Sequence, residues 1–403
     1  MNVLFLTLLD FNSIDEHNIY TDLLREFAKR DNQVYAISPV ERRKKQITKL
    51  IKEQNATILK LKIGNMQKTN CIEKGISTLT VESLFLGAIK KYFSDVKFDL
   101  VLYSTPPITF QRVVSYVKKR DKAQTYLMLK DIFPQNAVDL GLLKKTGVKG
   151  VLYRYFRNKE KRLYGISDKI GCMSQANVDY VLMHNPEIPK EKLEICPNSV
   201  EVMDKSVSLE EREIMRRKYG IPLGKKVFIY GGNLGKPQGI DFLIKCLASQ
   251  KDNDDLYFLV VGDGTEFGKL EAYVESLKQK NLKLMKRLPK EDYDAMVGAC
   301  DVGMIFLDHR FTIPNFPSRL LSYMQAKIPV LAVTDPNTDV GKIIVENECG
   351  CWCESNSVEH FNLAIKDVLE IKTPQFQKLN KEYSAENGYN IIMQVVKDRE
   401  KKV

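Results

Sequence analysis

Short apolar runs alternate with amphipathic stretches along most of the chain. Helical periodicity predicts helices over Ile19–Arg30, Val81–Phe93 and Phe110–Lys119 in the first half. Alternation of strands with helices is typical of doubly wound parallel sheets. Six apolar runs of the first half have the length of buried strands, and polar or turn residues bound each of them. These runs are Val3–Leu8, Gln33–Ile37, Leu100–Tyr103, Thr125–Leu129, Lys169–Met173 and Leu193–Cys196.

The second half repeats this plan. The chain has 403 residues, more than one hydrophobic core usually supports. The charged segment Val202–Leu223 ends in a Gly-Ile-Pro turn and suits a linker. We therefore expect an α/β protein with two Rossmann-like domains, residues 1–202 and 203–372, and a helical tail, 373–403, that returns to the first domain. Further strands are predicted at Lys226–Tyr230, Leu256–Val261, Leu282–Leu284, Val302–Ile305 and Val330–Ala332.

The excess positive charge is confined to the first half of the chain. Residues 1–200 carry 33 Lys and Arg against 21 Asp and Glu, whereas residues 201–403 carry 29 against 30. The excess is concentrated in Arg42–Lys62 and in Lys144–Arg162, where it is interleaved with Tyr153, Tyr155 and Phe156. Such a stretch can dock on an anionic leaflet, with about 1 kcal/mol from each surface cation. Nucleic acid attracts the same charge, and a solvated helix face has the same composition.

No stretch of the sequence has the about 20 apolar residues of a membrane-spanning helix. The run Val3–Leu9 has no basic flank before it and reaches Asp10 too soon for a signal peptide. Eight cysteines without a secretory signal indicate the reduced thiols of a cytosol. We expect a cytoplasmic protein whose contact with a membrane is peripheral.

Two glycine-rich loops follow predicted strands of the second domain. Gly231-Gly232-Asn233-Leu234-Gly235-Lys236 follows one strand, and Gly262-Asp263-Gly264 follows the next. Glycines permit close backbone approach to a ligand, and the helix N-termini at such strand ends favour anions. The second loop is not the dinucleotide fingerprint, because Gly268 comes one position too late. An ordinary tight turn from strand to helix has the same composition.

A third loop carries more specific chemistry. The segment from Ile313 to Val330 predicts a loop, a helix that starts near Pro317 or Ser318, and then a strand. Ser318, free backbone amides and Arg319 together suit a diphosphate, because the guanidinium fork matches phosphate oxygens. The alternative is a capped surface helix with a solvated arginine.

These loops, together with Ala299-Cys300-Asp301-Val302, resemble the GT-B glycosyltransferases of family 4 in their order and spacing. The similarity is greatest to the WbuB-like branch, which builds O-antigen and capsule repeat units. The first half agrees, since Tyr103-Ser104-Thr105-Pro106-Pro107, Lys130-Asp131-Ile132-Phe133-Pro134-Gln135 and Pro197-Asn198-Ser199-Val200-Glu201 resemble that branch's strand-end loops.

The resemblance implies a retaining transfer of a sugar from a nucleotide-sugar donor, expected to be UDP-linked. The implied acceptor is a polyprenyl-diphosphate-linked saccharide in bacterial surface polysaccharide assembly, on the inner face of the cytoplasmic membrane. This acceptor favours an anionic membrane over nucleic acid as the partner of the basic first domain. Donor binding is then expected at Gly232, Asn233, Lys236, Gly262, Gly264, Arg287, Pro317, Ser318, Arg319, Leu320 and Ser322.

The sequence departs from the family pattern at the donor site. Many members carry two glutamates eight positions apart around this helix, and the matching positions are Pro314 and Ser322. The usual phosphate-binding Arg and Lys of the first loop fall on Asn233 and Gln238. Lys236 and Arg319 are the nearest substitutes, and electrostatic stabilisation of the leaving diphosphate by these cations requires no metal ion.

Polar residues that follow strands of the first domain are candidates for the acceptor side. Asp131 follows the fourth strand, and either Asp131 or His17 could orient the attacking hydroxyl or take its proton. Acidic residues at such positions also serve simply as helix caps. The other expected acceptor-side residues are Asp10, Ser13, Glu16 and Ser104.

Other functions are also consistent with this pattern. A sugar-nucleotide epimerase can share the two-domain architecture, and a non-catalytic donor-binding partner would explain the absent glutamates. Metal binding and cofactors other than the nucleotide sugar are not expected, because Cys349-x-Cys351-x-Cys353 has the period of a strand and lacks the spacing of a zinc site. A serine hydrolase is poorly supported, since there is no G-x-S-x-G elbow.

Overall fold

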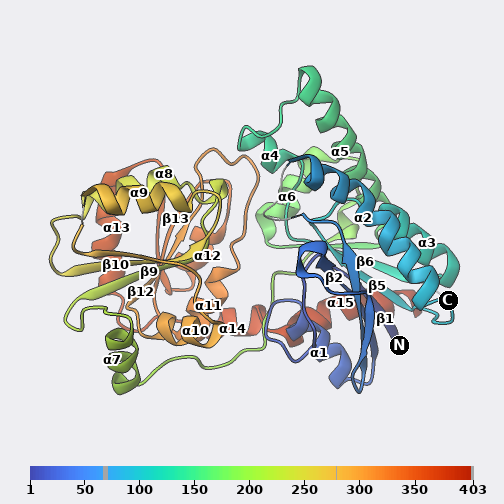
Figure 1. Ribbon diagram of the computed structural model, residues 1–403, viewed down its shortest axis with the longest axis horizontal. Coiled ribbons are helices and arrows are strands. Elements are labelled where there is room, and N and C mark those ends of the chain that lie inside the picture. The colour runs from blue at the N-terminus through green and yellow to red at the C-terminus, as the bar shows by residue number, and fades with distance from the viewer. Residues whose placement is uncertain (67–70, 278, 401–403) are drawn as a thin grey trace. The chain divides into compact units, whose positions relative to one another are not determined.

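The computed structural model describes residues 1–66, 71–277 and 279–400, and the chain divides into two units (Figure 1). Unit 1 comprises Met1–Glu201 and Tyr383–Val403, and unit 2 comprises Val202–Glu382. The expected tail, 373–403, is shared between them. Its first helix, α14 (Gln377–Glu382), belongs to unit 2, and its second, α15 (Ala385–Glu400), belongs to unit 1.

Unit 1 is built on a sheet that has eight strands within the described residues, in the order β3-β4-β2-β1-β5-β6-β7-β8. All neighbours are parallel except β3 and β4. The strands are β1 (Asn2–Leu6), β2 (Gln33–Glu41), β3 (Lys49–Lys52), β4 (Ala56–Ile63), β5 (Leu100–Ser104), β6 (Gln124–Leu129), β7 (Lys169–Cys172) and β8 (Leu193–Ile195). The helices are α1 (Thr21–Lys29), α2 (Cys71–Tyr92), α3 (Gln111–Asp121), α4 (Gln135–Asp139), α5 (Gly147–Ile166), α6 (Gln175–His184) and α15.

The helices α1 and α15 cover one face of this sheet. Leu24 and Phe27 of α1 and Ile392 of α15 are fully buried against the apolar side chains of β1 and β2. The rings of Phe27 and Tyr389 meet edge to face at 4.8 Å between centroids, and the Arg30 guanidinium lies 4.5 Å from the Tyr389 ring. Burial on both faces explains why the parallel strands are almost continuously apolar in sequence.

The basic segment Arg42–Lys62 contains two strands that the apolar pattern did not predict. Lys60 and Lys62 interrupt the apolar run of β4, and β3 pairs with β4 as an antiparallel hairpin at the sheet edge. Lys60 is completely buried and donates to the carbonyl of Phe11 at 2.8 Å and to the carboxylate of Asp10. One cation of this cluster is therefore an internal counter-ion and adds nothing to a membrane-facing surface.

Unit 2 is built on an all-parallel sheet that has six strands within the described residues, in the order β11-β10-β9-β12-β13-β14. This order is that of the Rossmann fold. Figure 1 shows α8 and α9 on one face of the sheet and α10 and α11 on the other. The strands are β9 (Lys226–Asn233), β10 (Leu256–Asp263), β11 (Leu282–Met285), β12 (Val302–Phe306), β13 (Val330–Thr334) and β14 (Gly350–Glu354). The helices are α7 (Leu209–Lys218), α8 (Ile240–Ser249), α9 (Phe267–Leu277), α10 (Lys290–Gly298), α11 (Arg319–Ala326), α12 (Val340–Glu346), α13 (Val358–Glu370) and α14.

Of the three cysteines at the end of unit 2, Cys351 and Cys353 lie on β14, as the period of two predicted, and Cys349 lies immediately before it. Cys353 is buried in the core cluster of unit 2, and Cys351 is packed against that cluster. No helix in the described part of the chain has the length and apolar character needed to cross a membrane.

Candidate functional site

The strand order of unit 2 places a topological switch point between β9 and β12. The chain leaves β9 toward β10 on one side and leaves β12 toward β13 on the other. The β9–β12 ladder contains the pairs Phe228–Val302 and Ile229–Gly303, although both strands continue beyond them. Ligands of open α/β sheets bind outside the carboxyl ends of the strands at such a point.

Tyr323 anchors helix α11 at this switch point. Its hydroxyl oxygen lies 2.9 Å from the carbonyl of Met304 on β12 and 3.2 Å from the carbonyl of Ile229 on β9. A Cβ atom at Gly303 would lie 2.4 Å from the Tyr323 ring, so glycine there makes room for the ring. The helix is therefore fixed to both strands at the place where they separate.

Arg319 lies one turn before Tyr323 on the same face of α11. Its guanidinium carbon is 4.2 Å from the ring centroid of Tyr230, whose hydroxyl donates to the carbonyl of Asn233 at 3.0 Å. The Nη1 atom of Arg319 is buried and has no hydrogen-bond partner among the described residues. A buried guanidinium nitrogen without an acceptor is costly, and a phosphate oxygen that reached it would supply the missing partner.

The first glycine loop passes directly beside this arginine. Gly232 has φ of 118°, a region that favours glycine, and a Cβ atom there would lie 3.6 Å from Nη2 of Arg319. A Cβ atom at Gly231 would lie 1.8 Å from the hydroxyl of Tyr293, and burial raises the pKa of that phenol to about 12. Backbone, guanidinium and two phenols thus meet at the carboxyl end of β9.

The second glycine loop packs closely against the first one. A Cβ atom at Gly262 would lie 2.0 Å from the carbonyl oxygen of Gly232, and one at Gly264 would lie 2.3 Å from that of Leu234. Leu234 donates to the carbonyl of Asp263 at 3.0 Å. The close approach that these glycines permit is therefore between the two loops.

Side-chain contacts also hold the loops around Arg319. Gln238 accepts from the backbone N–H of Gly235 at 3.1 Å and from the amide of Asn233 at 3.2 Å. On the other side, Thr338 donates to the carbonyl of Asn315 at 2.5 Å. The position that aligned with a family lysine, Gln238, therefore has a structural role in this protein.

The remaining predicted donor residues have different environments. Lys236 and Arg287 are exposed on separate loops, and Leu320 is fully buried in the core. Ser318 is exposed at the N-cap of α11, but its side chain makes no capping hydrogen bond. Pro317 and Ser322 are half-buried at the start and middle of this segment. The structure thus brings Gly232, Asn233 and Arg319 together around Tyr230, which the sequence analysis had not singled out.

Asp131 lies at the carboxyl end of β6 in unit 1. Both of its carboxylate oxygens accept from the amide of Asn136, at 2.9 and 2.8 Å. Its backbone N–H donates to the hydroxyl of Thr105 at 3.2 Å, which ties it to the loop after β5. Burial raises the pKa of Asp131 to about 6, against the opposing hydrogen bonds from Ile132 and Asn136. A carboxylate with this pKa can exchange a proton near neutral pH.

Lys130, the neighbour of Asp131, was missed by the sequence analysis. Burial lowers its pKa to about 8, and its ammonium lies 5.9 Å from the Tyr20 ring centroid. A lysine that ends an apolar strand is the signal that could have found it. Two groups that titrate on either side of neutrality thus stand next to each other in the chain.

Three of the other predicted acceptor-side residues, Asp10, Ser13 and Glu16, lie in the loop after β1. Asp10 accepts from Lys44 and Lys60, and although burial opposes ionisation, these two hydrogen bonds hold its pKa below the ordinary value. Glu16 accepts from the N–H of Asn12 at 2.8 Å, and Ser13 accepts from that of Asp15 at 2.9 Å. Ser104 is buried at the end of β5.

His17 belongs to a charged network of unit 1. Its Nδ1 atom lies 2.9 Å from Nη2 of Arg25, which also donates to Asp22 and to Glu201. The Nδ1 atom also lies 3.4 Å from Asp22 and 3.9 Å from Glu201, so both cationic and anionic groups surround it. Asp131, which has no cation among its hydrogen-bond partners, is the better placed of the two predicted catalytic residues.

Comparisons with known proteins indicate the class of enzyme. Residues 211–389 match the family model of glycosyl transferases group 1. The chain is a glycosyltransferase. It is 24% identical over 312 residues to the probable glycosyltransferase WbjE of Pseudomonas aeruginosa, an alignment that covers 77% of this chain and 75% of WbjE. It is 22% identical over 307 residues to the putative colanic acid biosynthesis glycosyl transferase WcaI of Escherichia coli K12, covering 74% and 73% of the two chains.

The fold also matches solved structures. The crystal structure of Anabaena HepE in complex with UDP and glucose superposes with a TM-score of 0.63 at 14% identity, over 98% of this chain and 96% of HepE. The glycosyltransferase therefore has the GT-B fold, in which both units are Rossmann-like. Among the described residues, no group of three or more His, Cys, Asp or Glu side chains is arranged to hold a metal ion.

Proposed function

We propose that this glycosyltransferase moves a sugar, with retention of configuration, from a UDP-sugar to a polyprenyl-diphosphate-linked saccharide during assembly of a bacterial surface polysaccharide. Unit 2 would bind the donor and unit 1 the acceptor. The names of WcaI and of the HepE complex support the polysaccharide and the UDP-sugar, respectively.

The observation that carries the donor assignment is the buried, unpartnered Nη1 atom of Arg319 at the switch point of unit 2. The ring of Tyr230 lies against the guanidinium, and Tyr323 fixes the helix that carries it to β12. The guanidinium is therefore in position before the ligand binds. A preorganised cation at the leaving diphosphate stabilises the charge that develops in the transition state. The exposed Lys236 and the backbone of Gly232 would complete the diphosphate site.

The acceptor assignment depends on Asp131. A partly buried carboxylate with a pKa near 6 can orient the attacking hydroxyl or accept its proton at neutral pH. The amide of Asn136 holds both carboxylate oxygens and would set the direction in which the remaining lone pairs point. His17, tied to Arg25, would contribute to the surrounding network.

A basic and apolar surface of unit 1 would bring the enzyme to the lipid acceptor. We define this docking surface by the exposed apolar side chains of Leu142, Val148, Val151, Leu152 and Tyr155 and the exposed cations Lys144, Lys145, Lys149 and Arg154. Val148 is 90% exposed, and Phe156 is instead packed on Phe133 at 5.1 Å. The docking surface therefore consists of the first turns of α5 and the loop before it.

Binding of UDP tests the donor site. Replacement of Arg319 by alanine removes a charge-assisted contact worth about 1.5–3 kcal/mol, so UDP and UDP-sugar affinity should both fall by roughly 10- to 150-fold. Isothermal titration calorimetry measures this directly. Arg217→Ala is a matched control, because Arg217 is an exposed arginine of α7 paired with Glu213.

The same proteins separate the proposed reaction from its alternatives. Incubation with UDP-sugars and a lipid-diphosphate acceptor gives transfer for the proposed enzyme, interconversion of the free nucleotide sugar for an epimerase, and binding without turnover for a non-catalytic partner. Unchanged UDP affinity in folded Arg319→Ala protein would remove the donor assignment.

A further inference from the structure

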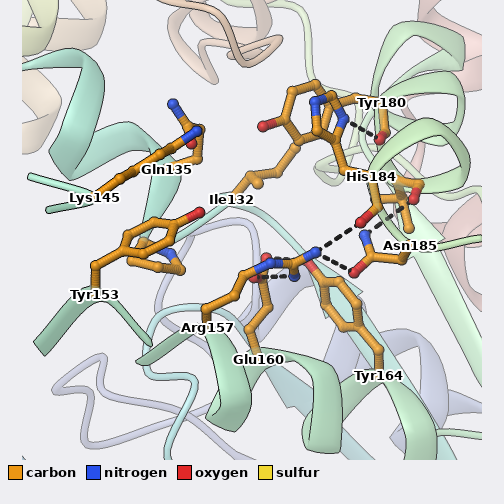
Figure 2. Close-up of a pocket in the computed structure, with 12 residues that line it drawn as sticks. Ile132, Gln135, Lys145, Tyr153, Arg157, Glu160, Tyr164, Tyr180, His184 and Asn185 are labelled. Carbon is orange, nitrogen blue, oxygen red and sulfur yellow. Dashed lines mark hydrogen bonds and ion pairs between the residues drawn. The ribbon is translucent and has the colours of Figure 1, made fainter. Parts of the chain in front are cut away.

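Unit 1 contains a cavity of about 210 Å³ between α4, α5 and α6 (Figure 2). Its volume is about seven times the roughly 30 Å³ that a water molecule occupies in the liquid. It is smaller than the about 300 Å³ at which pockets for drug-sized ligands begin. The cavity therefore suits a small group such as a phosphate or a diphosphate.

Three hydrogen-bond donors converge on this space. Figure 2 shows the hydroxyl groups of Tyr153 and Tyr180 and the ammonium group of Lys145 directed toward the same part of the cavity. Within the described residues neither hydroxyl has a hydrogen bond, and Lys145 has no ion pair; its ammonium lies 5.7 Å from the Tyr153 ring. Three unused donors match the non-bridging oxygens of a lipid diphosphate.

The acceptor groups near these donors are already occupied. Glu160 accepts from Arg157 at 2.5 Å and from the hydroxyl of Tyr164 at 2.9 Å. The amide nitrogen of Gln135 donates to Asp139 at 2.6 Å. The carboxylate of Glu160 is thus paired with Arg157. Burial, together with the nearby carboxylates of Glu160 and Asp139, raises the pKa of the Tyr153 and Tyr180 phenols, so both hydroxyls keep their protons and act as donors.

The walls of the cavity are rigid. Arg157 also donates to the carbonyl of His184 at 2.8 Å and to the amide oxygen of Asn185 at 2.6 Å, and so joins α5 to the end of α6. The ring of Tyr180 stacks on that of His184 with centroids 3.9 Å apart. Arg157 was expected to lie on a membrane-docking face, but these contacts show that it holds the cavity together.

The cavity adjoins both the docking surface and the loop that carries Asp131. Lys145 and Tyr153 come from the segment that forms the docking surface, and Tyr153 follows the exposed Leu152 directly. On the other side, Ile132 and Pro134 line the cavity and follow Asp131 in the chain. A lipid whose chain lies in the membrane beneath the docking surface could thus place its head group in the cavity.

We propose that this cavity is a lipid-phosphate pocket, which binds the diphosphate of a membrane-embedded lipid. Tyr153, Tyr180 and Lys145 donate to the phosphate oxygens, and Arg157 fixes the walls. The proposal rests on the proposed function in that the same lipid carries the acceptor sugar. Phosphodiester head groups have one charge and fewer free oxygens, so the pocket discriminates against ordinary anionic phospholipids.

The test uses the full chain and a double variant, Tyr153→Phe with Tyr180→Phe, which keeps both rings. Farnesyl diphosphate and inorganic diphosphate are titrated calorimetrically in the presence of saturating UDP, which occupies the donor site. We expect affinity to fall roughly tenfold for each hydroxyl removed, since each donates to a charged acceptor. Tyr92→Phe is the matched control, because Tyr92 is a half-buried tyrosine of α2 outside the cavity.

Vesicles distinguish the two lipid sources of phosphate. Phosphatidylcholine vesicles that contain polyprenyl diphosphate are compared with ones that contain phosphatidylglycerol at equal surface charge. The wild-type protein should prefer the diphosphate vesicles, the double tyrosine variant should lose this preference, and replacement of Lys144, Lys149 and Arg154 by Met should weaken binding to both. Lys190→Met, at an exposed site of unit 1, is the control for loss of charge.

The proposal is overturned if the double variant binds farnesyl diphosphate as tightly as the wild type, or if the wild type shows equal affinity for the two kinds of vesicle. Failure to bind any anionic vesicle would instead remove the docking surface, and the calorimetric result would then stand as the measure of the pocket. Donor binding and sugar transfer are measured separately. Loss of either of them would contradict the proposed function, even where the wild-type protein binds farnesyl diphosphate and the double tyrosine variant does not.

Discussion

The two sheets share a strand order around their first strands but carry opposite chemistry at their carboxyl ends. At the switch point of unit 2, glycines bring backbone close to one arginine whose Nη1 atom is buried without a partner. At the carboxyl edge of the sheet in unit 1, titratable side chains stand where unit 2 has glycines. Burial raises the pKa of Asp131 to about 6 and lowers that of Lys130 to about 8.

On the proposed assignment of donor and acceptor, this difference explains how one fold would bind two kinds of substrate. An anionic diphosphate is bound best by backbone amides and a fixed cation, which need glycine and little side-chain volume. A neutral hydroxyl that must lose a proton needs a group that titrates near the working pH. In both units the strand order determines where the candidate site lies, and the residues of the local loops determine which chemical groups it contains.

The largest expected effect comes from Asp131. Replacement by asparagine removes the proton acceptor while nearly preserving shape, so transfer should fall by roughly 10²-fold or more. Donor affinity should stay near that of the wild type, because the proposed role of the residue is on the acceptor hydroxyl. Steady-state transfer assays and UDP-sugar titrations measure the two quantities. Near wild-type transfer would leave Asp131 only its structural role as the partner of Asn136. A collapse of donor binding would show that Asp131 acts on the donor and not on the acceptor.

A smaller effect is expected when the glycine loops of unit 2 are forced apart. Gly264→Ala places a Cβ atom 2.3 Å from the carbonyl of Leu234, and the overpacking should destabilise the protein by about 1–3 kcal/mol and weaken UDP binding. Thermal unfolding and calorimetry report both. Gly268→Ala is the control: nothing lies within 4 Å of its Cβ position in α9, and alanine there should be neutral or stabilising. Equal stability of the two variants would contradict the account of loop packing.

The smallest effect is a dependence on pH that only unit 1 should show. Because the pKa of Asp131 is raised to about 6, the carboxylate is ionised above that pH and protonated below it. Transfer should therefore fall about tenfold for each pH unit below 6, and Asp131→Asn should lack this acid limb. A kcat profile that is flat from pH 5 to 7 in the wild type would show that the group does not titrate in catalysis.

Much of the fold was predictable because apolar runs and turns mark parallel strands clearly. The predicted strands of both halves are present with ends shifted by a few residues, as β1 and β9 illustrate. The hairpin of β3 and β4 was missed because Lys60 interrupts an apolar run, and only its burial against Asp10 explains a lysine in that position.

The candidate site was less predictable, because its contacts join residues that are distant in sequence. The sequence marked Gly232 and Arg319 through loop composition. It gave no sign that Tyr230 lies beneath the guanidinium or that Tyr293 fills the space above Gly231. The pKa of Asp131 likewise depends on burial by residues that the local pattern does not contain.

The return of the chain to unit 1 has a consequence for synthesis on the ribosome. Val200 donates to the carbonyl of Tyr383 at 2.9 Å and accepts from Ala385 at 2.8 Å, so the chain leaves unit 1 and re-enters it at one place. The helix α15, which buries Phe27 and its neighbours on α1, emerges only after all of unit 2 has been translated. The nascent N-terminal portion must therefore wait with an apolar face uncovered, and chaperones that hold such faces are the factors on which its yield in the cell should depend.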